Sequence, residues 1–115
     1  MSVQIHPEGS KPTPYITLIN HITVLPANIS PLCAFVQAQL PWFAAQPGFI
    51  SYAIHRTVAD DEASRVVLYQ QWASKADLQA MRTHPEFKDR LAGFRSFIES
   101  AQVALYDVVD VRIAE

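Results

Sequence analysis

The stretch RVVLYQQWASKADL, residues 65–78, decides the fold, because a strand pattern passes directly into a helix start within it. Successive side chains of a strand point to opposite faces, so one face of this strand carries Val66, Leu68, Gln70 and Trp72. Ser74, with Asp77 three residues later, resembles the capping box that begins a helix. We therefore predict a strand over residues 65–72 and a short helix directly after it.

Three other segments are rich in β-branched residues and predict strands: 15–25 (YITLINHITVL), 49–57 and 103–111. The polar run VADDEAS, residues 58–64, predicts a hairpin loop between the second and third strands. On the first strand, the face with Asn20 is otherwise apolar, whereas the opposite face is mixed. We expect the Asn20 face to meet the helices.

Two longer helices complete the pattern. The first should begin with Ser30 as the capping residue and Pro31 in the first turn, and should run to about Gln46. Pro41 lies inside it and is expected to kink or split it. The second should begin at Thr83, with a capping partner at Glu86. Its apolar stripe comprises Phe87, Leu91, Phe94 and Ile98.

The resulting order β-α-β-β-α-β predicts an α+β, ferredoxin-like fold, with a four-stranded antiparallel sheet and helices on one face. The 115 residues fit one domain over residues 15–115. Residues 1–14 are polar and proline-rich, which indicates a loose N-terminal tail.

Composition excludes several classes of function. The net charge is −2 with no basic cluster, so we expect no nucleic-acid partner. No apolar run approaches a membrane span. The only cysteine, Cys33, precludes an intrachain disulfide and favours a cytoplasmic location. The charged fraction of 17% is low for a small domain, which suggests that a partner covers part of the surface.

Motifs for cofactors are also missing. The sequence has no glycine-rich phosphate loop, and its four histidines lack the spacing of metal ligands. We therefore expect no cofactor and no metal.

Residues 15–106 resemble an antibiotic biosynthesis monooxygenase domain. The matching pieces are TLINHITV (17–24), QPGFISYAIHR (46–56), RVVLYQQWASKADL (65–78) and THPEF (83–87), in the family's order. The resemblance implies that two chains pair their sheets into a dimeric α+β barrel. It also implies a pocket for a small hydrophobic or aromatic molecule between the sheet and the helices of each chain.

Three residues are candidates for catalysis, each with a structural alternative. An unpaired buried amide costs about 1–3 kcal/mol, so Asn20 should bind either a ligand or a neighbouring loop. Trp72 is either core or a pocket wall whose indole N–H donates to a bound oxygen atom. His84 is either a surface residue or a group that moves a proton at the pocket mouth. The Tyr52 ring shares the inner face of the second strand and should reach the pocket.

Three leucines depart from the family's known sites and are expected to line the pocket instead. Leu68 stands where quinone-forming members place an asparagine, and Leu78 where they place a tyrosine. Leu91 appears at the position of the histidine ligand of haem-degrading members. The resemblance therefore disfavours haem degradation and leaves the known oxygenase site incomplete.

Three functions remain open on this sequence. The first is a cofactor-independent monooxygenase that oxidises an electron-rich aromatic, such as a hydroquinone or an anthrone, with dioxygen. The second is a non-catalytic dimeric domain that binds a small molecule. The third is an isomerase or lyase, for which only His84, Tyr52 and His55 could transfer protons.

Overall fold

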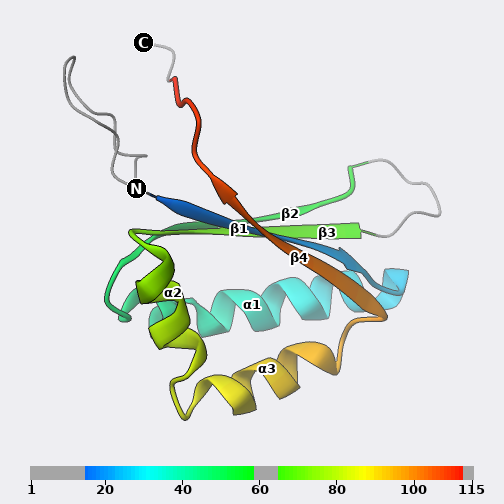
Figure 1. Cartoon of the computed structure of the whole chain (residues 1–115). Coiled ribbons are helices and arrows are strands. Elements are labelled where there is room, and N and C mark those ends of the chain that lie inside the picture. The colour runs from blue at the N-terminus through cyan, green and yellow to red at the C-terminus, as the bar shows by residue number, and fades with distance from the viewer. Residues whose placement is uncertain (1–14, 59–64, 113–115) are drawn as a thin grey trace.

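The computed structural model describes residues 15–58 and 65–112, so the predicted tail at residues 1–14 and most of the predicted hairpin loop lie outside the described residues. Four strands and three α-helices follow one another in the predicted order (Figure 1). The strands are β1 (Ile16–Thr23), β2 (Phe49–Arg56), β3 (Arg65–Trp72) and β4 (Ser100–Asp107). The helices are α1 (Ile29–Ala44), α2 (Lys75–Arg82) and α3 (Phe87–Arg95), and a short 3₁₀ turn, η1 (Pro26–Asn28), precedes α1.

The strands form one antiparallel sheet in the order β2-β3-β1-β4, and all three helices lie on the same side of it (Figure 1). This is the ferredoxin-like α+β arrangement that the sequence predicted. In the register, Asn20 of β1 stands between Leu68 of β3 and Val103 of β4. These three side chains therefore share the face that meets the helices.

Two groups of buried residues fill the space between sheet and helices. One is built around Ile22, Leu32 and Val66, toward the start of α1, and the other around Trp72 and Leu78, toward α2. The Trp72 ring is fully buried, and the Phe49 ring meets it edge-on at 5.5 Å. Members of both groups, such as Leu68 and Leu18, line a cavity between the sheet and the helices.

The start of β2 and the start of α2 pack tightly against each other, through Gly48 before β2 and Ser74 before α2. Gly48 has φ +85°, which favours glycine, and its carbonyl accepts a hydrogen bond from the Ala73 N–H at 2.7 Å. The Ser74 hydroxyl accepts from the Asp77 N–H at 3.1 Å, as the capping pattern predicted. A Cβ on Gly48 would lie 2.3 Å from the Asp77 side chain, so these two features are packed against each other.

Several predicted boundaries were wrong. α1 begins at Ile29 after the 3₁₀ turn rather than at Ser30, and Pro41 does not split it. Pro41 lacks the N–H that would donate a helical hydrogen bond. It lies in the last turn of α1, where the loss of that bond does not divide the helix.

The capping prediction for α3 was also wrong. The Thr83 hydroxyl donates back to the Ala80 carbonyl at 3.0 Å and so closes α2. α3 begins at Phe87, after Glu86, whose side chain makes no capping bond. The last strand was predicted too late in the chain, because β4 begins at Ser100, three residues earlier than predicted, and ends at Asp107, four residues earlier.

Candidate functional site

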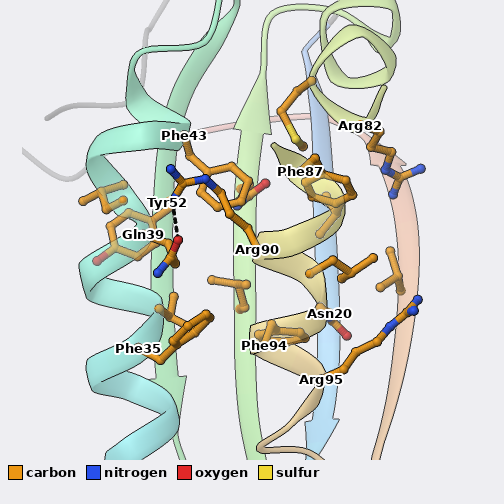
Figure 2. Close-up of a pocket in the computed structure, with 18 residues that line it drawn as sticks. Asn20, Phe35, Gln39, Phe43, Tyr52, Arg82, Phe87, Arg90, Phe94 and Arg95 are labelled. Atoms are coloured by element: carbon orange, nitrogen blue, oxygen red, sulfur yellow. Dashed lines mark hydrogen bonds between the residues drawn. The ribbon is translucent and has the colours of Figure 1, made fainter. Parts of the chain in front are cut away.

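A cavity of about 400 Å³ lies between the inner face of the sheet and helices α1 and α3 (Figure 2). This volume is within the range of pockets that hold small organic ligands. Apolar and aromatic side chains make up most of its wall, with two amide residues from the strands, one from α1 and three arginines from α2 and α3. The lining residues are Leu18, Asn20, Phe35, Val36, Gln39, Leu40, Phe43, Tyr52, Leu68, Gln70, Met81, Arg82, Phe87, Arg90, Leu91, Phe94, Arg95 and Val103.

Asn20 brings an unsatisfied polar group to this cavity. Its side chain comes from the middle of β1, and only 7% of the residue is exposed. The Oδ1 atom is buried and has no hydrogen-bond partner among the described residues. Leaving such an atom unpaired costs about 1–3 kcal/mol. Within the described part of the chain, the Oδ1 atom therefore makes no hydrogen bond to a neighbouring loop.

Trp72 does not line the cavity but holds a residue that does. Its indole Nε1–H donates to the Oε1 atom of Gln70 at 3.1 Å, and Gln70 lines the cavity while Trp72 does not. Gln70 is itself only 7% exposed. The bond fixes the orientation of the Gln70 amide, because Oε1 must face the indole and the amide nitrogen then faces elsewhere. The indole N–H predicted to meet a bound oxygen atom is thus already occupied.

The catalytic role predicted for His84 meets a similar difficulty. Its ring packs edge-on against Trp42 at 5.2 Å, and its Nδ1 atom accepts a hydrogen bond from the Glu86 N–H at 3.1 Å. His84 is not among the residues that line the cavity. His55 is exposed near the end of β2 and is also outside the lining. Of the three predicted proton-transfer groups, only Tyr52 lines the cavity.

The leucines divide in the same way. Leu68 and Leu91 line the cavity, as predicted, from β3 and α3. Leu78 is fully buried beside Trp72 in the core toward α2 and does not reach it. The structure therefore brings together Asn20, Tyr52, Leu68 and Leu91, and places Trp72, Leu78 and His84 outside the lining.

Arg90 is the most firmly held polar side chain of the cavity that the sequence did not single out. Its guanidinium lies 4.7 Å from the centre of the Trp42 ring. It donates to Gln39 of α1 and pairs with Glu86 at 3.3 Å, one turn earlier on the helix. Its Nε atom is buried without a partner among the described residues.

The signal for Gln70 was present in the sequence, because a polar residue on an apolar strand face was the reason for choosing Asn20. The arginines offered no such signal. Arg90 and Arg95 lie on an amphipathic helix, where charged residues are usually exposed. The structure nevertheless places both of them in the lining of the cavity.

The described residues contain no cluster of three or more histidine, cysteine or acidic side chains that could hold a metal ion. Among the helices of residues 15–58 and 65–112, none is long and apolar enough to span a membrane.

Comparisons with known proteins agree with this architecture. The family model described as antibiotic biosynthesis monooxygenase matches residues 15–92. A mutant of SnoaB, described as a cofactor-independent oxygenase from Streptomyces nogalater, superposes with a TM-score of 0.75 at 20% identity, covering 84% of this chain and 95% of that one. A conserved protein from Methanosarcina mazei gives a TM-score of 0.70 at 12% identity, covering 82% and 92% of the two chains. No curated protein matches the sequence significantly.

Proposed function

Because this chain belongs to the antibiotic biosynthesis monooxygenase family, we propose that it oxidises a small electron-rich aromatic molecule with dioxygen and without a bound cofactor. The substrate would be a hydroquinone or an anthrone. The observation that carries the proposal is the buried Asn20 Oδ1 atom, which has no partner among the described residues and belongs to an apolar cavity of ligand size. A fold of this type hosts several activities, so the site must carry the argument.

The chemistry places modest demands on the protein. The substrate loses a proton, and its electron-rich anion can give an electron to dioxygen and then combine with it as a peroxide. For an anthrone, the reacting CH₂ becomes C=O, one oxygen atom stays in the product, and the other leaves as water with both hydrogens. The protein supplies a dry pocket, a fixed orientation and hydrogen bonds to oxygen atoms.

The polar lining residues have distinct roles in this proposal. The Asn20 Oδ1 atom accepts a hydrogen bond from a substrate hydroxyl. Gln70 offers a second amide, and Trp72 positions it through the indole hydrogen bond. Tyr52 is the lining residue with a hydroxyl that can relay the substrate proton. The ring of His84 would have to leave Trp42 before it could serve as the base.

Oxygen uptake by the purified protein tests the proposal, with anthrone and a naphthohydroquinone as probes. We expect a rate well above the spontaneous one, and a fall of about tenfold in Asn20→Ala, the scale of losing one hydrogen bond that holds the substrate. Gln79→Ala is the matched control, because Gln79 is an exposed amide on α2 outside the cavity. Equal rates with and without protein across both probes would refute the proposal.

The apolar wall favours one other function, a domain that binds a small aromatic molecule without turning it over. Leu68 and Leu91 add apolar surface at positions where relatives are expected to carry polar groups. Thermal-shift measurements separate the two functions. Binding of the product quinone together with no oxygen uptake would favour the binding domain.

The proposal also includes a homodimer in the cytoplasm. The sheet face away from the helices carries Ile19, Tyr69 and Tyr106, and no described element covers it (Figure 1). All eight residues of β4 are exposed in the single chain. The lone Cys33 suits a reducing compartment.

A further inference from the structure

The charged side chains that line the cavity are all cationic. Arg82, Arg90 and Arg95 line it, and none of its lining residues is acidic. Arg82 and Arg90 are partly buried and Arg95 is exposed, so these guanidinium groups are accessible to an anion that enters the cavity. The imbalance is a local feature, because the chain as a whole carries a net charge of −2.

The three arginines differ in how far they are already engaged. Arg90 is held by Trp42, Gln39 and Glu86. Neither Arg82 nor Arg95 has an ion pair within the described part of the chain. Figure 2 shows Arg90 reaching toward α1, whereas Arg82 and Arg95 lie on the other side of α3, toward β4. The free cationic groups are therefore gathered on one side of the cavity.

The unpaired buried atoms of the site complete the pattern. Asn20 Oδ1 is an acceptor that needs a donor, such as a phenolic hydroxyl. Arg90 Nε–H is a donor that needs an acceptor. A ligand that satisfies this lining has an apolar ring system, a hydroxyl group for Asn20, an acceptor for Arg90 and an anionic group for Arg82 and Arg95.

We propose that the substrate is a hydroxylated aromatic carboxylate, whose ring fills the apolar interior and whose carboxylate is received by Arg82 and Arg95. This deepens the proposed function, on which it rests, by naming the substrate's charged group. Arginine suits this task because its planar guanidinium binds both oxygens of a carboxylate. Arg82 and Arg95 also close the last turns of α2 and α3, where a cation stabilises the helix. The experiment must separate that structural role from ligand selection.

The probes are a hydroxynaphthoate with its two substituents on opposite rings and the methyl ester of the same compound. Titration under anaerobic conditions and fixed salt gives a Kd for each. We expect the wild-type protein to bind the acid about tenfold more tightly than the ester, as a charge-assisted hydrogen bond provides. Arg82→Gln and Arg95→Gln should each reduce that ratio about threefold while leaving ester binding unchanged.

Lys88→Gln is the matched control, because Lys88 is an exposed cation on α3 that does not line the cavity. It removes the same charge from the same helix and should leave the ratio intact. Equal binding of acid and ester by the wild-type protein would overturn the inference. An equal loss of the ratio in Lys88→Gln would overturn it too, since the preference would then reflect general charge rather than these two arginines.

Failure of this inference is distinguishable from failure of the proposed function. Acid preference without any oxygen uptake would leave the ligand class standing and remove the oxidation. Oxygen uptake on neutral hydroquinones without acid preference would do the reverse.

Discussion

At the scale of single residues, Asn20 and Gln70 present the same amide group on the same sheet face in opposite states. Gln70 is satisfied by the Trp72 indole, whereas the Asn20 oxygen has no partner among the described residues. A residue whose burial weakens the fold is often retained for function. The pair therefore allows stability and function to be separated at two positions of one cavity.

Replacing Asn20 by leucine should stabilise the protein. The change removes an unsatisfied buried polar atom and adds apolar surface of similar size, so we expect the free energy of unfolding to rise by about 1 kcal/mol. Urea denaturation monitored by tryptophan fluorescence measures this change. The same variant should have lost the oxidation reaction. A destabilised Asn20→Leu would mean that the amide has a partner in the folded protein.

Gln70→Met should have the opposite effect on stability. It removes the acceptor of the buried Trp72 indole N–H and leaves that donor unsatisfied, at a cost of about 1–3 kcal/mol. A double-mutant cycle with Trp72→Phe isolates the contribution of the bond. If Gln70→Met costs as much in the Trp72→Phe background as in the wild type, the hydrogen bond is not the cause.

At the scale of elements, the sequence predicted the strands and helices better than their ends. All four strands and all three helices were found in the predicted order, because alternation and helical spacing are properties of many residues together. The boundaries at Ser30 and Thr83 were wrong because each capping signal rests on one hydroxyl. At Thr83 that hydroxyl found a carbonyl of the preceding helix instead.

The site was predictable to the extent that it depends on strand faces. Asn20, Tyr52 and Leu68 were placed correctly because side-chain direction alternates along a strand. Trp72 was not, although it lies on the correct face, because its position beyond the cavity depends on packing against Phe49 and Leu78. The arginines depend on how α2 and α3 pack over the sheet, which the sequence alone does not specify.

Gly48 tests how tightly the β2–α2 junction is built. Gly48→Ala should destabilise the protein by about 2–3 kcal/mol, since alanine is strained at positive φ and its Cβ would meet the Asp77 side chain. Thermal and urea denaturation give the cost. Adding Asp77→Ala should recover the part due to the clash and leave the part due to φ. No recovery in the double variant would show that the backbone conformation alone accounts for the loss.

At the scale of the whole molecule, the edge strand β4 is exposed along its whole length. Tyr106, which is 45% exposed, belongs to the sheet face away from the helices, whereas Val103 and Leu105 share the inner face with Asn20 and Leu18. On the sheet face away from the helices, the Ser51 hydroxyl donates to Gln71, which in turn donates to Thr17, so a polar row crosses three strands, and Gln71 and Thr17 are both buried in it. Ile19, Tyr69 and Tyr106 lie on the same face as this row, and apolar and aromatic side chains of this kind are typical of the centre of a protein–protein interface.

We expect two chains to pair through this face, and Ile19→Asp to separate them. Ile19 stands between Tyr69 and Ala104 on the uncovered face, so a carboxylate there would be buried without a partner in a dimer and solvated in a monomer. Sedimentation velocity measures the change. Leu25→Asp, which places the same charge on a residue that is 52% exposed outside the sheet, should remain a dimer.

A stable interface buries about 800 Å² on each partner, which corresponds to a large part of one sheet face. A wild-type protein that sediments as a monomer at micromolar concentration would contradict the pairing. So would an Ile19→Asp variant that stays dimeric, because the interface would then lie elsewhere on the molecule.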